Sequence, residues 1–86
     1  MYLHLGQNTI VRDKDIIGIF DLDITSQSIR TRKFLNNAEK RGEVFAVTDD
    51  IPKSFVVSGQ RGRQRIYISQ LSTATLLRRS ESSELV

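Results

Sequence analysis

The sequence SFVVSGQRGRQRIYIS, residues 54–69, contains two apolar runs separated by a polar segment with two glycines. The runs at residues 54–57 and 64–69 have the composition of short β-strands. Glycines in a connection of this length are typical of a tight turn. The stretch therefore predicts a β-hairpin whose connection is residues 58–62.

The second strand of this hairpin has two chemically different faces. Because side chains alternate along a strand, its isoleucines face the core and Arg63, Arg65 and Tyr67 share the outward face, with Arg61 at the turn. Guanidiniums bind phosphate oxygens through paired hydrogen bonds, and an aromatic ring can stack on a base. This face is predicted to contact nucleic-acid phosphates. The alternative is that its charges only keep a sheet edge soluble.

The N-terminal segment predicts a second hairpin. Residues 2–5 and 9–11 are short apolar runs, and Gly6-Gln7-Asn8 separates them. A further strand is expected at residues 43–48, which include four consecutive apolar residues. The loop that follows it contains the only proline, Pro52.

Residues 15–24 give the strongest strand signal of the chain. Alternation places Ile17 and Ile19 on one face and Ile16 and Phe20 on the other. A strand that is apolar on both faces is covered on both, and one cover can be another subunit. We therefore expect Ile17 and Ile19 to form an oligomer interface.

One well-defined helix is predicted at about residues 27–41, with N-cap oxygens before it and Gly42 closing it. A rotation of about 100° per residue gathers Phe34, Leu35 and Ala38 on its core side. Arg30 and Lys33 belong to an adjacent basic side. That side either contacts phosphate, or is simply solvated, or meets acidic residues of a neighbouring subunit.

The order of these elements predicts an α+β fold: an antiparallel sheet of about five or six short strands with one main helix packed on it. Ser72 or Thr73 is expected to cap a short C-terminal helix that ends at residue 79. Residues 1–79 are expected to form a single oligomerising domain and residues 80–86 a flexible tail.

Composition limits the chemistry. A chain of 86 residues has room for one small core, and small domains use disulfides, metals or self-association to gain stability. This chain has no cysteine and a single histidine, His4, so we expect no disulfide, metal site or cofactor and look to self-association. It has no signal peptide and no apolar run long enough to span a membrane, which favours a cytoplasmic protein without membrane contact.

Charge is segregated along the chain, although the net charge is only +3. Residues 29–41 contain five basic residues and one acidic residue, and residues 53–70 contain four basic residues and no acidic residue. Lys53 begins the second basic segment. Two basic segments separated by acidic ones favour an acidic partner, and duplex DNA is the one we expect.

Enzymatic activity is not expected. The segment from Phe20 to Thr25 resembles the Asp-x-Asp-x-Thr nucleophile motif of haloacid-dehalogenase-type phosphatases. That chemistry needs a parallel sheet with a lysine and further acidic residues on later strands. The residues after Thr25 instead predict one helix and antiparallel hairpins, so no catalytic residue is assigned.

Three segments resemble the RemA/RemB family: Met1–Gly6, Asp15–Asp23 and Glu39–Gly42. The resemblance extends over roughly residues 1–80. Members of this family are small cytoplasmic DNA-binding regulators that activate biofilm-matrix operons and assemble into rings. The resemblance therefore implies a ring-like homo-oligomer that binds duplex DNA.

This sequence departs from the family pattern at one stretch. RemA-like chains carry an arginine pair, implicated in DNA contact, just after the strand that follows the helix. Here that stretch is Asp49-Asp50-Ile51-Pro52-Lys53, which is mainly acidic. Either the phosphate-binding surface has moved to Arg61, Arg63 and Arg65, or this member binds DNA weakly and acts through a partner.

Two functions are consistent with the sequence. The first is a DNA-binding transcriptional regulator of extracellular-matrix genes that acts as a ring-like homo-oligomer. Its predicted DNA contacts are Arg61, Arg63, Arg65, Tyr67, Lys53, Arg30 and Lys33. The alternative is a protein-interaction module that oligomerises with, or modulates, a RemA-like relative without binding DNA strongly itself.

Overall fold

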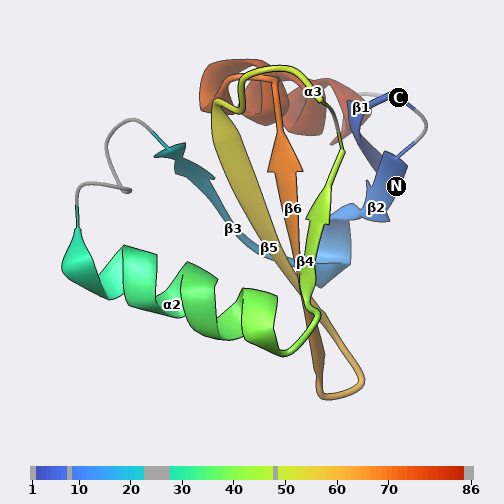
Figure 1. Cartoon of the computed structure of the whole chain (residues 1–86). Helices are drawn as coiled ribbons and strands as arrows, with labels where there is room; N and C mark the ends of the chain where they lie inside the picture. The colour runs from blue at the N-terminus through green and yellow to red at the C-terminus, as the bar shows by residue number, and fades with distance from the viewer. Residues whose placement is uncertain (1, 8, 23–27, 48, 85–86) are drawn as a thin grey trace.

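The structure, a computed structural model, describes residues 2–7, 9–22, 28–47 and 49–84. Within these residues the strands come in runs, and each run is followed by one α-helix, which confirms the α+β class (Figure 1). In chain order they are β1 (Tyr2–Gly6), β2 (Thr9–Arg12), the 3-10 turn η1 (Asp13–Asp15), β3 (Ile16–Asp21), α2 (Ile29–Lys40), β4 (Val44–Ala46), β5 (Ser54–Gln60), β6 (Arg63–Ser69) and α3 (Thr73–Glu84).

The described strands form two sheets, not the single antiparallel sheet that the sequence predicts. Strands β1 and β2 form an antiparallel two-stranded ribbon. The other sheet has the order β3-β5-β6-β4, and β4 pairs with β6 in parallel. The reason is α2: a helix between two strands returns the chain to the end of the sheet where the first strand began. Strand β4 therefore runs in the direction of β3 and lies at the opposite edge.

Local sequence determines both ends of α2. At its start, the Ser28 hydroxyl accepts a hydrogen bond from the Thr31 amide at 3.5 Å. At its end, Gly42 has φ +71°, and the amides of Gly42 and Glu43 donate to the carbonyls of Glu39 and Ala38 at 3.0 Å each. This pair of bonds is a Schellman motif, whose left-handed position glycine fills without strain. The predicted closure at Gly42 is confirmed.

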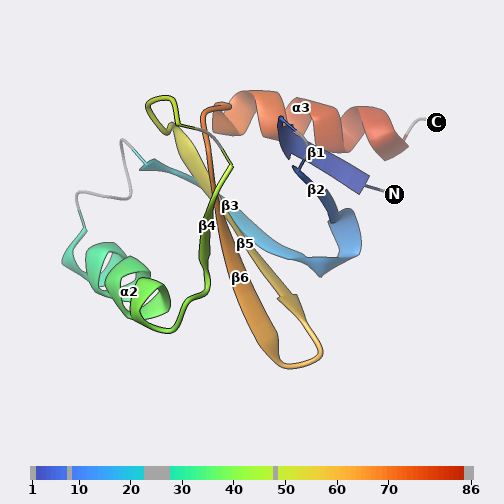
Figure 2. The same cartoon turned by 45° about the vertical axis from the view of Figure 1, so that its right-hand side comes forward.

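The four-stranded sheet is covered on both faces. Helix α2 packs on one face, where Ala38 is buried with Phe55, Val57 and Ile66. The β1–β2 ribbon and α3 cover the other face (Figures 1 and 2). The arrangement confirms the core side predicted for the helix, because Phe34 and Leu35 also pack against this cluster. Two small cores thus lie on either side of one sheet.

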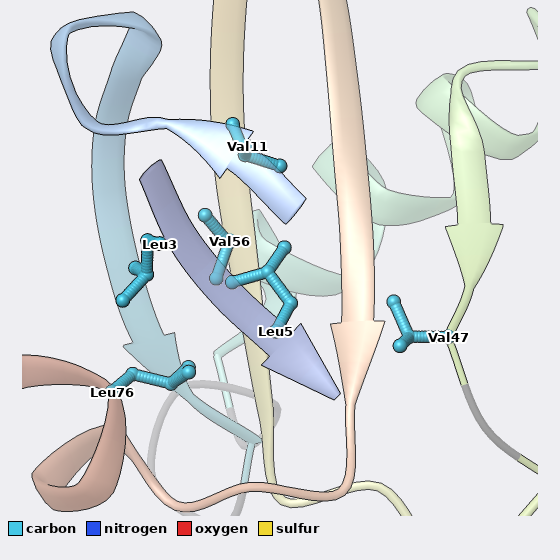
Figure 3. Packing of buried hydrophobic residues seen from close by; sticks show 6 residues of the cluster. All are labelled: Leu3, Leu5, Val11, Val47, Val56 and Leu76. Carbon is cyan, nitrogen blue, oxygen red and sulfur yellow. The ribbon is translucent and has the colours of Figure 1, made fainter. Parts of the chain in front are cut away.

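The core beneath the ribbon joins residues from distant parts of the chain. Leu3 and Leu5 of β1, Val56 of β5 and Leu76 of α3 are buried together with Val11 and Val47 (Figure 3). The buried Ser69 hydroxyl donates to the Leu5 carbonyl at 2.6 Å and so links the ribbon to β6. Fully burying an aliphatic side chain contributes about 1.5–3 kcal/mol, so this small cluster holds the ribbon in place.

A bulge in β3 changes the faces that alternation predicts. The pairing register with β5 shifts between Ile16 and Gly18. Ile16 consequently packs against the same core as Ile19, whereas Phe20 stacks on Phe55 on the α2 side with ring centroids 5.0 Å apart. The prediction that Ile16 and Phe20 share a face is wrong, because a bulge inserts one residue into the alternation. The predicted end of this strand, at residue 24, lies outside the described residues.

Helix α3 is longer than expected. The Ser72 hydroxyl accepts a hydrogen bond from the Thr75 amide at 3.2 Å, which confirms one of the two predicted caps. The helix runs on to Glu84 and does not end at residue 79. The division into a domain at residues 1–79 and a flexible tail remains a prediction. None of the helices within the described ranges is long and apolar enough to cross a membrane.

Candidate nucleic-acid interface

The β5–β6 hairpin ends in a two-residue turn formed by Arg61 and Gly62. Both have positive φ, 52° and 77°, as a type I′ turn requires, and Gln60 pairs with Arg63 just before it. The turn protrudes beyond α2 and the β1–β2 ribbon in two views (Figures 1 and 2). Because non-glycine residues rarely adopt left-handed backbone, Arg61 holds its place at the tip at a cost of about 1 kcal/mol.

The two faces of β6 are as alternation predicts. Arg63 and Arg65 are exposed and Tyr67 is half-buried, while Ile66 is fully buried beneath α2. Tyr67 packs against the core under the ribbon, so the two arginines lie on the same face as the ribbon. The predicted grouping of these arginines with Tyr67 is therefore confirmed as a structural arrangement.

A groove of about 730 Å³ lies between this face and the β1–β2 ribbon. One wall is the hairpin and the other is the ribbon with the 3-10 turn after it. Both walls carry arginines, and the ribbon wall adds exposed apolar side chains. The lining residues are Tyr2, Ile10, Val11, Arg12, Asp15, Ser58, Gln60, Arg61, Arg63, Arg65 and Tyr67.

The groove is strongly positive. Among the described lining residues four are arginines and one is an acid, Asp15, whose carboxylate lies 3.7 Å from the Arg12 Nε. Within the described residues, Arg61, Arg63 and Arg65 form no ion pair. A guanidinium without a carboxylate partner keeps its donors for an external anion. The groove can therefore bind phosphate oxygens.

Arg65 is held by an aromatic neighbour. Its guanidinium carbon lies 5.7 Å from the centroid of the Phe45 ring, a cation–π distance. Phe45 in turn lies next to Tyr67, with ring centroids 5.9 Å apart. Parallel pairing of β4 with β6 brings the two rings into register. The contact restricts the rotamers of Arg65 before any ligand arrives.

Residue-type patterns alone did not point to the ribbon wall of the groove. Tyr2 and Arg12 are directly opposite each other in the β1–β2 pairing, and Ile10 is 59% exposed. Alternation within the short strand already separates Ile10 and Arg12 from the buried Val11. The position of the ribbon opposite β6 could not be predicted from local sequence, because packing in the core determines this position.

The other predicted DNA contacts lie elsewhere. Arg30 and Lys33 are exposed on α2, which covers the opposite face of the sheet. Lys53 precedes β5 at the end of the sheet where Ser54 pairs with Ser69, the far end from the Arg61 turn. The structure therefore does not bring these three residues together with the hairpin arginines.

The acidic stretch that departs from the RemA-like pattern is also remote from the turn. Asp49 and Asp50 are exposed and lie between β4 and β5, next to Lys53. They therefore share the far end of the sheet, and the hairpin arginines lie outside their immediate surroundings. Ile51 in the same loop is 84% exposed.

The two predicted interface residues differ in burial. Ile17 is 70% exposed, and its Cδ1 lies over the backbone of Gly59. Ile19 is partly buried against the core under the ribbon. Both belong to β3, an edge strand of the four-stranded sheet, so the outer backbone edge of this strand has no partner within that sheet.

The phosphatase-like motif has the wrong strand pairing for that chemistry. Asp21 ends β3, which pairs antiparallel with β5, whereas the motif belongs to parallel sheets. The second aspartate and the threonine, Asp23 and Thr25, lie outside the described residues. In the part of the chain that the structure describes, no three His, Cys, Asp or Glu side chains are grouped to hold a metal ion.

Comparison with known proteins identifies the family. A family model described as RemA-like, extracellular matrix regulatory protein A-like, matches residues 2–79. The chain is 37% identical over 81 residues to extracellular matrix regulatory protein B of Bacillus subtilis (strain 168), and this match covers 94% of the chain and 91% of the relative. The chain therefore belongs to the RemA-like family of extracellular matrix regulatory proteins.

Proposed function

We propose that this chain is a DNA-binding transcriptional regulator of extracellular-matrix genes, acting in the cytoplasm. The printed name of the relative supports the regulatory part. The observation that carries the DNA-binding part is the protruding hairpin, on which Arg61, Arg63 and Arg65 lie together without an ion pair among the described residues. Tyr67 lies on the same face and offers a ring next to these charges.

A single subunit binds weakly under this proposal. Three hairpin guanidiniums make about three phosphate contacts, and each lowers the slope of the logarithm of the binding constant against the logarithm of salt concentration by about 0.9. Several copies in one assembly act on the same duplex and multiply their effective concentration. We therefore place the function in a ring-like homo-oligomer with repeated hairpins.

The hairpin contacts the DNA backbone and reads few bases directly. Guanidiniums at a β-turn can reach phosphates, but phosphate contacts carry no sequence information. The basic helix α2 covers the opposite face of the sheet and carries no arginine of the groove. Specificity therefore comes from the shape and bending of the duplex around the assembly.

The decisive experiment compares two triple variants that remove the same charge. Arg61→Ala/Arg63→Ala/Arg65→Ala changes the hairpin, and Arg30→Ala/Lys33→Ala/Lys40→Ala changes α2. Fluorescence anisotropy of a labelled matrix-promoter duplex is measured against salt. We expect the hairpin variant to lose about one unit of salt slope for each lost contact and the α2 variant to keep its slope.

The controls make the outcome unambiguous. Circular dichroism and thermal melting establish that both variants fold. No binding by the wild-type chain at low salt would contradict the DNA-binding function. An unchanged slope in the hairpin variant together with a reduced slope in the α2 variant would instead place the contact on Arg30 and Lys33.

Self-association is proposed to use the β3 edge. Ile17 and Ile19 belong to this edge strand, and Ile17 leaves 70% of its surface exposed. Exposed apolar side chains on an edge strand favour contact with another chain. Ile17→Asp is expected to shift the light-scattering mass toward the monomer. The matched control is Ile29→Asp on α2, whose isoleucine is 64% exposed and whose change should leave the mass unaltered.

A monomeric wild-type chain at tens of micromolar would contradict the assembly. A variant that only unfolds is recognised by its loss of circular dichroism signal, and Ile17→Ser then repeats the test with a milder change. An Ile17→Ser variant that folds and keeps the wild-type mass would remove Ile17 from the interface.

The second candidate is a protein-interaction module that modulates a RemA-like relative. The loop at the far end of the sheet favours it, because Ile51 is 84% exposed beside Asp49 and Asp50. An exposed apolar side chain with polar residues around it can serve as a protein contact. Co-elution with a RemA-like protein that Ile51→Ser abolishes, in a chain that does not bind duplex DNA at low salt, would establish this function instead.

A further inference from the structure

We propose that the groove between β6 and the β1–β2 ribbon is a nucleotide-binding site, and that a bound nucleoside diphosphate competes with DNA for the hairpin arginines. The nucleotide-binding site requires only the groove and does not depend on DNA binding. The competition rests on the proposed function, because it requires that Arg63 and Arg65 also contact DNA.

The shape of the site favours a small ligand. Its volume of about 730 Å³ lies in the range of roughly 300–1,000 Å³ that is typical of small-molecule sites. A duplex presents a convex backbone, which reaches the protruding turn but cannot fill a groove between two hairpins. The ribbon wall is therefore the part of this surface that DNA leaves unoccupied.

The ribbon wall has the chemistry to hold a base. Tyr2 and Ile10 are 62% and 59% exposed, although both are large apolar side chains at the groove. Val11 adds buried apolar surface, and Tyr67 contributes a second ring from the opposite wall. Bases stack favourably on aromatic side chains, so a flat ring is a suitable occupant. A surface that only bound phosphate would have no use for these side chains.

The charges of the groove match a diphosphate. Its lining contains four arginines and one aspartate. Arg12 lies opposite Tyr2 in the ribbon, and Arg63 and Arg65 lie on the facing strand. Guanidiniums on both walls can bind a diphosphate of two to three negative charges from two sides. Asp15 beside Arg12 supplies an acceptor for a ribose hydroxyl or an exocyclic amine.

The two ligands share only part of the surface. DNA is assigned Arg61, Arg63 and Arg65, and the nucleotide is assigned Tyr2, Arg12, Arg63 and Arg65. A nucleotide in the groove therefore takes two of the guanidiniums that DNA needs. Matrix-gene regulation would then respond to the nucleotide concentration, because binding of one ligand lowers the affinity for the other by the same factor.

Isothermal titration of the full chain with ADP, adenosine and pyrophosphate tests the site. We expect ADP to bind more tightly than adenosine, which lacks the charge, and more tightly than pyrophosphate, which lacks the ring. Tyr2→Ala and Arg12→Ala should each weaken ADP binding by about tenfold, the loss of roughly 1.4 kcal/mol. Arg30→Ala on α2, which removes the same charge outside the groove, should leave ADP binding unchanged.

Three outcomes would overturn the site: no heat with millimolar ADP, equal affinity for ADP and pyrophosphate, or ADP affinity that survives both groove variants in folded protein. A separate experiment tests the competition between ADP and DNA. Saturating ADP should raise the Kd of the promoter duplex beyond an ionic-strength-matched sulfate control, and in Tyr2→Ala this rise should disappear. If the wild-type chain binds ADP but no DNA, the regulatory function fails and the nucleotide site remains.

Discussion

The two basic segments of this chain carry the same net charge on opposite faces of one sheet. On α2, Arg30 and Lys33 lie on a helix whose other side packs against a core. On the β5–β6 hairpin, Arg63 and Arg65 face a groove and a second basic wall. The helix presents its cations on a convex surface, whereas the hairpin arginines are concentrated along one wall of a groove. Charge concentration of this kind raises the local potential and attracts anions more strongly than the same charge spread over a convex surface.

The two basic segments also differ in the rigidity of their basic residues. The guanidinium of Arg65 is held over the Phe45 ring at 5.7 Å, and the turn fixes the backbone of Arg61, whereas the basic side chains of α2 project from a helix surface. An ordered guanidinium loses less rotamer entropy when it binds phosphate. Equal charge therefore does not mean equal affinity, and the following variants test that statement.

The largest effect is expected from charge reversal. Arg63→Glu/Arg65→Glu should weaken duplex binding by about 100-fold or more, because two charge-assisted hydrogen bonds of roughly 1.5–3 kcal/mol each are replaced by repulsion. Arg30→Glu/Lys33→Glu changes the net charge equally and should weaken binding only by the general loss of attraction, about threefold. Electrophoretic mobility shifts at fixed salt measure both. Equal losses would mean that only net charge matters.

A smaller effect should follow from removing the ring beneath Arg65. Phe45→Leu keeps an apolar side chain but removes the cation–π contact, which contributes about 0.5–1 kcal/mol, so duplex affinity should fall by about two- to fivefold. Phe34→Leu on α2 is the matched control, and it should leave duplex affinity unchanged. Anisotropy titration of the folded variants measures the difference. If Phe45→Leu leaves duplex affinity unchanged, the Phe45 ring does not contribute to DNA binding by Arg65.

The smallest effect is expected at the turn, where stability and binding should move in opposite directions. Arg61→Asn relieves left-handed strain and should stabilise the chain by about 0.5 kcal/mol, while it loses one phosphate contact and about threefold in duplex affinity. Gly62→Ala leaves the charge of Arg61 in place. It puts a side chain at φ 77° and should destabilise the chain by about 1 kcal/mol. Urea unfolding measures both changes. An Arg61→Asn variant that is less stable would contradict a strained turn.

Local patterns predicted the parts of the molecule in which neighbours in sequence are neighbours in space. Alternation along β6 placed Arg63, Arg65 and Tyr67 on one face, and Gly42 correctly ended α2. The parallel pairing of β4 could not be predicted in this way, because it depends on the path of the chain around the sheet. The bulge after Ile16 was missed for a related reason, since a bulge arises from pairing with β5.

The two walls of the candidate site also differ in how far local sequence predicts them. Its hairpin wall is continuous in sequence and was predicted from residues 61–67. Its ribbon wall, with Tyr2 and Arg12, comes from the other end of the chain and meets β6 only through tertiary packing. A groove between distant segments has no short sequence pattern, so only the structure revealed it.

The Ser69–Leu5 hydrogen bond has a consequence for how such a groove can change. The ribbon belongs to a separate sheet, and besides this bond and the one that Arg79 Nη1 donates to the His4 carbonyl at 3.2 Å, it rests mainly on a few buried side chains. The width of the groove therefore depends on the size of buried residues such as Leu3, Leu5 and Val56, which are not among its lining residues. Substitutions among Leu3, Leu5 and Val56 would move one wall relative to the other, so ligand preference in this protein can evolve from inside the core.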